Sequence, residues 1–348
     1  MRMEDFANIP MSFVGPMRIG GDLLVGEYEV PLATFEAPLW PSVDRGARVS
    51  MHTEKGIQCT LIDDRMTRSI LLEAPNASEA NRILLQLKAD DSFLVEAVAS
   101  TGRFVSLIDI HAQIAGKLLF LRLAFKTGDA AGHNMCTQAA EAVLNALIEK
   151  YASLTYESIS GNYCSDKKAT AVNGILGRGK YMVAELTIPE KLCSRFLKTS
   201  PQRLVKLNVR KNLIGTLLAG GVRSANAHVA NMLLGFYLAT GQDAANIVEG
   251  SQAITFAEVQ DDALYFSVTI PNLIMGTVGN GKGLEFVVSN MRRMGLLEER
   301  KIGENSRRLA ALCAATVLCG ELSLLAAQTN PGELMNAHRR IERGSSQV

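Results

Sequence analysis

Residues 160–168 are Ser-Gly-Asn-Tyr-Cys-Ser-Asp-Lys-Lys, and Gly177-Arg178-Gly179-Lys180 follows shortly afterwards. Asp166, Lys167 and Lys168 place one carboxylate beside two ammonium groups, behind a small and flexible start. A lysine crowded by a second cation and a carboxylate can have its charge and direction tuned for polarising a carbonyl group. The simpler interpretation is a solvated loop with an incidental charge cluster. By itself the stretch does not exclude that interpretation.

The composition is that of a globular protein of one or two domains. The chain has 348 residues, of which 47% are hydrophobic and 20% charged, and this is enough for two domains or for one large domain with an insertion. A formal net charge of +1 argues against a nucleic-acid partner bound by bulk electrostatics. Six cysteines show neither CxxC nor metal-ligand spacing, which indicates reduced thiols, no metal and a cytoplasmic protein.

No segment is expected to enter a membrane. The amino terminus lacks the apolar core of a signal peptide. Residues 309–327 are the most apolar stretch, but Glu321 interrupts them, and the uninterrupted run is shorter than the roughly 20 residues a span requires. This stretch predicts a buried helix in a soluble protein.

The fold class predicted is α+β. Residues 69–160 show the order strand, helix, strand, strand, helix, strand, which is that of a ferredoxin-like βαββαβ module. The flanks, 1–68 and 161–348, are richer in helical pattern and are expected to form one large domain around this insertion. Residues 339–348 are charged and then small and polar, which favours a mobile tail.

Three further positions are candidates for chemistry. Glu36 is the single carboxylate in the apolar run 30–40, where burial would raise its pKa and suit a general acid, or it is a peripheral residue in a turn. His228 and Asn231 share a helix face at i and i+3, although a lone histidine in an apolar helix is more often a core residue. Asp243 follows a helix-ending glycine and is equally suited to capping the next helix.

Six separated stretches together decide among these alternatives. They are Val30-Pro-Leu-Ala-Thr-Phe-Glu36, Thr127-Gly-Asp-Ala-Ala-Gly-His-Asn-Met135, residues 160–168, Asn226-Ala-His-Val-Ala-Asn231, Gly241-Gln-Asp-Ala-Ala-Asn246 and Thr277-Val-Gly-Asn-Gly-Lys282. In this order they resemble the 3-hydroxy-3-methylglutaryl-coenzyme A (HMG-CoA) reductase family, over nearly the whole chain. The resemblance is to the catalytic core of the larger class, found in eukaryotes and archaea.

The resemblance implies a set of site residues. The catalytic set is Glu36, Lys167, Asp243 and His338. The substrate-binding set is Arg68, Ser160, Asp166, Lys168, Lys211, His228 and Asn231. The cofactor-binding set is Arg103, Phe104, Asp129, Asn134, Gly279, Asn280 and Gly281. An arginine is a bidentate donor for a 2′-phosphate, so Arg103 favours NADPH over NADH.

The function expected from this resemblance is the reduction of HMG-CoA to mevalonate with two NADPH, in a homodimer or higher homo-oligomer whose active site lies between subunits. Five departures from the family pattern keep an alternative open, namely Phe35, Ala37, Gly102, Ala131 and His133. That alternative is a catalytically weakened relative that binds acyl-CoA or a dinucleotide as a sensor.

Overall fold

The computed structural model describes residues 7–342 of the chain. The strands are β1 (Met11–Gly20), β2 (Gly26–Ala33), β3 (Ile57–Glu73), β4 (Ser106–Ala115), β5 (Leu118–Lys126), β6 (Thr155–Ser158), β7 (Gly179–Pro189), β8 (Ile254–Gln260) and β9 (Ala263–Leu273). The longer helices are α1 (Leu39–His52), α2 (Ala77–Ala89), α3 (Ser92–Ala99), α4 (His133–Lys150), α9 (Val229–Ala239), α11 (Glu285–Arg293), α12 (Glu304–Gln328) and α13 (Glu333–Glu342). Shorter helical pieces are α5 (Ala171–Leu176), α6 (Glu190–Leu192), η1 (Cys193–Leu197), α7 (Pro201–Leu207), η2 (Asn208–Gly215), α8 (Thr216–Leu218), η3 (Ala244–Asn246) and α10 (Ile247–Gly250).

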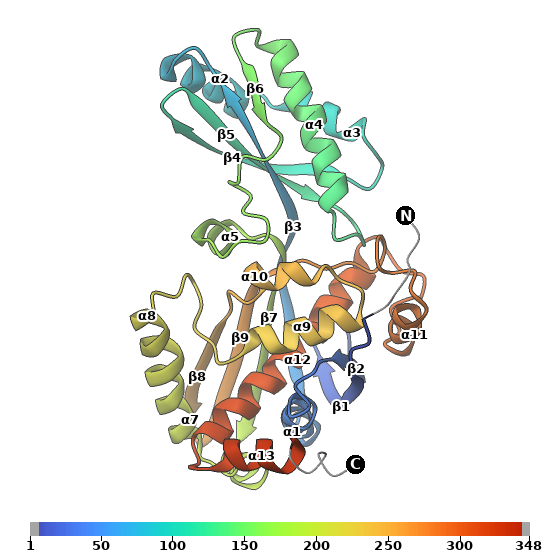
Figure 1. Ribbon diagram of the computed structural model, residues 1–348, viewed down its shortest axis with the longest axis vertical. Helices are drawn as coiled ribbons and strands as arrows, with labels where there is room; N and C mark the ends of the chain where they lie inside the picture. Colours follow the sequence, from blue (N-terminus) through green and yellow to red (C-terminus); the bar gives the residue numbers. More distant parts are fainter. Residues whose placement is uncertain (1–6, 343–348) are drawn as a thin grey trace.

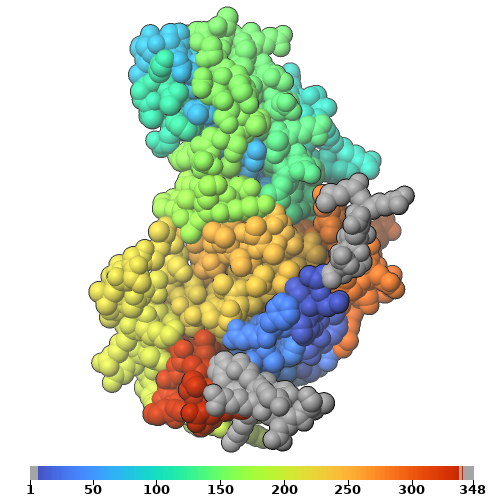
Figure 2. All heavy atoms as spheres, in the orientation of Figure 1, coloured from blue at the N-terminus to red at the C-terminus, as the bar shows by residue number. Residues whose placement is uncertain are grey.

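Strand β3 connects the two parts of the molecule. Its first half pairs with β1 and β7 in a sheet of order β2-β1-β3-β7-β9-β8, and its second half pairs with β5 and β6. Figure 1 shows β3 rising from the lower body into the upper unit, which also holds α2, α3 and α4. Figure 2 shows the same division, with the unit in blue to green above the remainder.

The upper unit is a four-stranded antiparallel sheet of order β6-β3-β5-β4. The sequence predicts its strands and its two main helices, and the structure contains them. Asn76, a residue type that is favoured at helix amino termini, caps α2, because its side chain accepts a hydrogen bond from the Glu79 N–H. Two details were not predicted: the extra helix α3, and the start of β3 at Ile57 rather than near Ser69. The acidic pair Asp63 and Asp64 obscured the continuity of this strand in the sequence.

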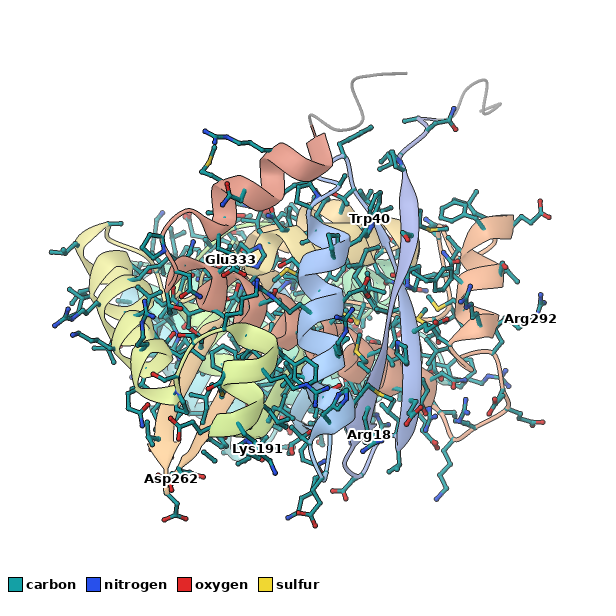
Figure 3. All side chains as sticks on the ribbon, turned by 90° about the horizontal axis from the view of Figure 1, so that it is seen from below. Arg18, Trp40, Lys191, Asp262, Arg292 and Glu333 are labelled. Carbon is teal, nitrogen blue, oxygen red and sulfur yellow. The ribbon has the colours of Figure 1, made fainter. Side chains whose placement is uncertain are left out.

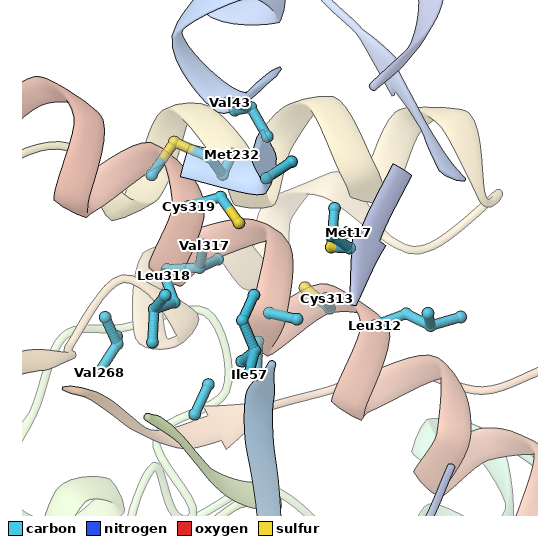
Figure 4. Packing of buried hydrophobic residues seen from close by; sticks show 14 of the residues in the cluster. Met17, Val43, Ile57, Met232, Val268, Leu312, Cys313, Val317, Leu318 and Cys319 are labelled. Carbon is cyan, nitrogen blue, oxygen red and sulfur yellow. The ribbon is translucent and has the colours of Figure 1, made fainter. Parts of the chain in front are cut away.

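The hydrophobic interior forms two clusters. One lies in the upper unit, where α4 and the sheet bury residues such as Leu121, Val143 and Leu147. The other surrounds α12 in the lower body, and Figure 4 shows Met17, Ile57, Met232 and the two cysteines of this helix packed together there. The lower sheet and α12 therefore provide the rigid support beneath the candidate site.

Helix α12 is the buried helix that the sequence predicts. Within residues 7–342 it alone is long and apolar enough to cross a bilayer, but 94% of its most apolar window is buried inside the protein. All six cysteines are buried and free of disulfides. Burial raises the pKa of the Cys59 thiol to about 12, so this group stays a neutral core residue.

Candidate functional site

The loop 160–168 has an unusual backbone. Asn162, Ser165 and Lys167 have φ angles of 56°, 49° and 57°, in the left-handed region that side chains with a Cβ rarely adopt. Each such residue costs of order 1 kcal/mol or more, so contacts outside the loop must hold it. The Ser69 hydroxyl accepts the Tyr163 N–H at 3.1 Å, and the Asn173 amide donates to the Ser165 carbonyl at 3.0 Å. The loop is therefore pinned between β3 and α5, which Figure 1 shows between the upper unit and the body.

Lys167 and Asp243 form the central ion pair of this region. The Lys167 Nζ atom lies 2.7 Å from the Asp243 Oδ2 atom. Its hydrogen bond to Asp243 raises the pKa of the Lys167 ammonium. Burial alone would raise the pKa of Asp243, but the bonds from Lys167 and the Ala245 N–H outweigh it and leave that pKa lowered. Both groups are therefore charged at neutral pH, and a charged ammonium can stabilise negative charge on a carbonyl oxygen.

A buried charge network lies behind this pair. The Arg178 guanidinium contacts the Asp166 carboxylate at 2.7 Å and lies 3.6 Å from Glu249, and both Arg178 and Glu249 are almost fully buried. Glu249 accepts the backbone N–H of Lys167 at 3.1 Å and the Asn246 amide at 2.9 Å. Burial favours a raised pKa for Asp166, but Arg178 and His133 keep it low.

Sequence reasoning missed Glu249 as a site residue. A single carboxylate between Val248 and Gly250, soon after the Gly241–Asn246 motif, was a signal that could have found it. The pKa of Glu249 is raised by burial, in spite of its hydrogen bonds.

A pocket of about 700 Å³ opens around Lys167 and Asp243. Its lining brings together predicted residues from every part of the chain, namely Arg68, Asn134, Asp166, Lys167, Asp243, Gly279 and Asn280. His133 and Lys282 lie in the same wall. The amino terminus of α4 borders the pocket, and a helix amino terminus favours bound anions. Burial lowers the pKa of Lys282 to about 8, so this ammonium is an adjustable cation next to the ion pair.

The glycine turn 279–281 is shaped by a close backbone contact. Gly281 has φ +81°, and a Cβ added there would meet the Gly241 carbonyl oxygen at 2.6 Å. Gly241 is similarly constrained, because its own Cβ would meet the Gly281 carbonyl oxygen at 2.5 Å. Only glycine fits at either position. The turn is thereby held against the end of α9, and Gly279 and Asn280 face the pocket.

Three residues predicted to contact the cofactor lie outside the lining of this pocket, namely Asp129, Arg103 and Phe104. Both carboxylate oxygens of Asp129 accept backbone N–H groups at the start of α12, from Gly303 at 2.8 Å and Ser306 at 2.9 Å, so this residue is a helix cap. Arg103 and Phe104 line a separate pocket of about 620 Å³, with the Arg103 guanidinium 4.6 Å from the Phe104 ring centre. The segment 127–135 borders both pockets.

Glu36 belongs to a different part of the surface. It lines a pocket of about 390 Å³ with His228 and Asn231, and the Asn231 amide donates to the Glu36 Oε2 atom at 3.0 Å. Of the two interpretations of Glu36 that its sequence segment left open, burial in the apolar run is wrong and the peripheral turn is confirmed, because β2 ends at Ala33 and Glu36 is exposed after it. Glu333 of α13, labelled in Figure 3, lines the same pocket, and its carboxylate forms a 2.7 Å ion pair with the Arg45 guanidinium.

The predicted catalytic residues form two groups at opposite ends of α9. The Glu36 group is Glu36 with His228 and Asn231, and the Lys167 group is Lys167 with Asp243. His228 immediately precedes this 11-residue helix and Asp243 follows it. At about 1.5 Å per residue the helix is roughly 16 Å long. The Lys167 ammonium contacts Asp243 at the far end, whereas Glu36 is bonded to Asn231 in the first turn. One chain thus presents two incomplete groups of the predicted catalytic residues.

The remaining predicted residues vary in their surroundings. The Lys211 ammonium donates to Asn212 at 3.0 Å, and burial lowers its pKa. Lys168 is exposed and donates to the Asp166 carbonyl at 3.0 Å, and the Ser160 N–H donates to the Ser158 hydroxyl at 3.0 Å. His338 lies in α13, but its side chain is outside the described part of the structure, as are residues 343–348 of the predicted tail.

Among the side chains that the structure describes, no three or more histidine, cysteine or acidic groups are placed to hold a metal ion. The site consists of ammonium, guanidinium and carboxylate groups. Its chemistry is therefore that of charge stabilisation and proton transfer.

Comparison with known proteins shows extended similarity. Residues 6–343 match the family model described as hydroxymethylglutaryl-coenzyme A reductase. The 3-hydroxy-3-methylglutaryl-coenzyme A reductase of Pyrococcus abyssi is 42% identical over 345 residues, covering 98% of this chain and 84% of that protein. The protein of the same name from Aeropyrum pernix is 41% identical, covering 98% of this chain and 80% of the relative. A class II reductase of Streptococcus pneumoniae, solved with NADPH bound, has the same fold, with a TM-score of 0.74 at 17% identity over 93% of this chain and 86% of that one.

Proposed function

The chain belongs to the hydroxymethylglutaryl-coenzyme A reductase family, and we propose from this premise how its residues carry out the reaction. The reaction is the NADPH-dependent reduction of HMG-CoA to mevalonate and coenzyme A in two steps. The observation that carries the assignment is the 2.7 Å contact of Lys167 with Asp243 in the large pocket. This contact supports the proposal because a fixed cation can stabilise the negative charge that develops on a substrate's carbonyl oxygen.

Each catalytic residue has a distinct role in this proposal. Lys167 stabilises the oxyanion at the thioester and later at the aldehyde, and Asp243 keeps the Lys167 ammonium charged and directed. Glu36 donates the proton to that oxygen, and His338 protonates the departing thiolate of coenzyme A. Arg68, Lys168 and the other predicted substrate residues bind the carboxylate and hydroxyl groups of HMG.

NADPH supplies a hydride in each step when it is bound. The residues present fit this cofactor, because the 700 Å³ pocket combines the amino terminus of α4, a glycine turn and the cation Lys282. Arg103, in the neighbouring pocket, is placed to bind a 2′-phosphate if the dinucleotide extends along segment 127–135. NADPH is accordingly favoured over NADH.

A homodimer or larger homo-oligomer completes the site in this proposal. Its support is the separation of Glu36 from Lys167 by the length of α9, because a proton donor must lie within hydrogen-bond reach of its acceptor. A second copy that brings its Glu36 group to the Lys167 loop would join them. Leu217 and Leu218 of α8 are 75% and 84% exposed, and apolar side chains of this kind are suited to a subunit contact.

Mixing two inactive variants tests this arrangement. Glu36→Gln and Lys167→Ala chains, unfolded and refolded together, should regain about a quarter of wild-type activity, because half of the dimers are mixed and each has one intact site. A mixture of Lys167→Ala with Asp243→Asn is the matched control and should stay inactive, since both residues come from the same chain. Equal recovery, or none, in the two mixtures would contradict an intersubunit site.

The domain division is also a proposal. Residues 69–160 would be an inserted ferredoxin-like module for NADPH, and 1–68 with 161–348 the large HMG-CoA-binding domain. Two observations support this division: the upper unit has its own antiparallel sheet of order β6-β3-β5-β4, and it has a separate hydrophobic cluster. Hydrogen exchange should show NADPH protecting the α4 segment, and HMG-CoA protecting the segment around His228. The same segments protected by both ligands would count against the division.

We place the protein in the cytoplasm, because all six cysteines are unpaired and buried. Cell fractionation tests this directly, and recovery in the membrane fraction would contradict it.

The activity itself is tested by NADPH and NADH oxidation with HMG-CoA, measured side by side. Oxidation that depends on the thioester supports the reductase, whereas binding without oxidation would favour the alternative of a weakened acyl-CoA or dinucleotide sensor. His338→Gln should impair reduction of HMG-CoA and spare reduction of free mevaldehyde, which has no thiolate to release. His52→Gln, at an exposed histidine of α1, is the control. Equal damage to both substrates would rule out His338 as the thiolate's proton donor.

A further inference from the structure

Glu321 is a carboxylate that the proposed chemistry does not use. It lies in the middle of α12 and is fully buried in the second, α12-centred hydrophobic cluster of the lower body. Its Oε2 atom accepts the Ala227 N–H at 2.7 Å, and its Oε1 atom accepts the His228 N–H at 2.6 Å. An ionised carboxylate can accept both bonds, whereas a protonated one would direct a hydrogen towards one of these donors. Burial raises the pKa of the Glu321 carboxyl, whereas the two backbone donors, one bonded to each oxygen, favour its ionised form.

Both donors immediately precede α9. The side chain of His228, the N-cap residue, makes no capping hydrogen bond, and the first helical N–H, that of Val229, is bonded to the Asn226 Oδ1 atom at 3.3 Å. Glu321 supplies acceptors from a different helix, 94 residues away in sequence. Negative charge is also favoured at a helix amino terminus. Glu321 thus fixes where α9 begins, and with it the position of His228.

Gly320, the residue before Glu321, determines which ring nitrogen of His228 carries the proton. The His228 Nε2 atom lies 3.0 Å from the Gly320 carbonyl oxygen. A carbonyl only accepts, so Nε2 carries the proton and Nδ1 is left with its lone pair. A Cβ at residue 320 would lie 2.4 Å from the Met232 sulfur, so glycine is what lets α12 approach α9 this closely.

The Nδ1 atom of His228 faces the amide of Asn231 at 3.4 Å. The same Asn231 nitrogen donates to the Glu36 Oε2 atom at 3.0 Å. An amide has two hydrogens, and a histidine with its lone pair on Nδ1 accepts one and leaves the other for the carboxylate. A histidine protonated on Nδ1 would instead repel the amide group. The contacts form a continuous path from α12 to Glu36.

We propose that Glu321 is a positioning residue for the reaction: with the Gly320 carbonyl, it fixes the orientation and tautomer of His228, and Asn231 passes that orientation to the Glu36 carboxylate. This proposal rests on the proposed function, in which Glu36 is the proton donor. It explains how an exposed carboxylate is held in one direction by a buried one. Glu321 does not contact substrate in this proposal and acts only through His228 and Asn231.

The first test is the nitrogen NMR spectrum of the histidine side chains in wild-type protein. His228 is assigned by the signal lost in His228→Gln, and it should show a single tautomer protonated on Nε2. A His228 signal protonated on Nδ1 would overturn the proposal without any change at Glu321. This measurement needs no turnover, so it is independent of whether HMG-CoA is the substrate.

The second test is Glu321→Gln, which keeps the volume of the side chain. An amide accepts only through Oε1, so one of the two backbone N–H groups loses its acceptor. His228 should then show a mixture of tautomers, and kcat for HMG-CoA reduction should fall roughly ten- to a hundred-fold, the usual worth of a hydrogen bond to a charged group. The Michaelis constant for NADPH should stay within about two-fold, since the cofactor pocket is separate.

Thr316→Val is the matched control. Thr316 is equally buried in α12, but its hydroxyl bonds only within the helix, to the Leu312 carbonyl at 2.7 Å. This variant should keep the wild-type His228 signal and kcat. A wild-type spectrum and kcat in Glu321→Gln would overturn the proposal, as would equal losses in both variants. If wild-type protein does not reduce HMG-CoA, the proposed function fails, but the His228 spectra still decide the positioning role.

Discussion

Glu249 is bonded to the backbone of the loop 160–168, and its removal should lower both the stability of the protein and its turnover. Its carboxylate accepts the Lys167 backbone N–H and the Asn246 amide, and it lies 3.6 Å from the buried Arg178 guanidinium. Glu249→Ala leaves the Lys167 N–H and the Asn246 amide without that acceptor, and it removes one of the two carboxylates beside the buried Arg178 guanidinium. Lys167 also loses a contact that maintains its left-handed backbone.

The expected magnitude follows from burial. Removing one partner of a buried charged network costs about 3–5 kcal/mol, because the other charge stays desolvated. An unfolding entropy of about 2.1 cal/mol/K per residue gives roughly 0.7 kcal/mol/K for a chain of this length, so each kcal/mol is worth about 1.4 °C. Glu249→Ala should therefore lower the melting temperature by roughly 4–7 °C. Calorimetry measures this directly, and kcat should fall at least about ten-fold, since the Lys167 ammonium is no longer held in place.

Glu249→Gln is the matched control, because it removes the negative charge and keeps the size of the side chain. It keeps an acceptor for the Lys167 N–H, and its amide nitrogen would occupy the position of the Oε2 atom, which has no hydrogen-bond partner. It should therefore lose much less stability and activity than Glu249→Ala. If Glu249→Ala melts within a degree or so of wild type and keeps its kcat, the network does not hold the loop and the reasoning is wrong.

Four further changes test individual side chains. Lys167→Ala should lower kcat by roughly 100-fold or more with the melting temperature unchanged, as for other preorganised electrostatic groups; near-normal turnover would transfer the role to Lys168. Arg103→Ala should raise the Michaelis constant for NADPH roughly ten- to a hundred-fold and leave that for NADH unaffected, whereas equal effects would show that it does not contact the 2′-phosphate. Burial and the nearby Arg178 guanidinium lower the pKa of His133 below its ordinary 6.5. Folding then favours the neutral ring, so the contribution of His133 to the free energy of unfolding is present above pH 6.5 and is lost as the pH falls below it. In His133→Met the melting temperature should therefore fall less steeply on the acid side of this pH. An unchanged fall would show that His133 does not cause it. NADPH binding near pH 8 should take up protons as its phosphates raise the pKa of Lys282, and calorimetry in two buffers should show that Lys282→Thr abolishes this uptake.

The spacing of apolar and polar residues within one segment was enough to predict the helices and strands that depend on contacts close in the sequence. The strands and helices of the upper unit, the Asn76 cap and the buried helix α12 all follow from spacing within one segment, and the structure contains each of them. The family is also readable from the chain alone, because its motifs are short and occur in order. The roles assigned to single side chains remain predictions until the variants are measured.

Tertiary structure decided how those motifs meet. The sequence contained no sign that Asp129 caps a helix 174 residues away or that Glu321 fixes the start of α9. Glu249 could have been singled out as a lone carboxylate, but its hydrogen bond to the Lys167 backbone could not. It also left open whether Glu36 is buried or peripheral, and the turn after β2 places this residue at the surface. A carboxylate in an apolar stretch has the same local pattern whether it caps a helix, holds a loop or faces solvent. Its partner is supplied by a distant segment, and only the packing of the whole chain determines which segment that is.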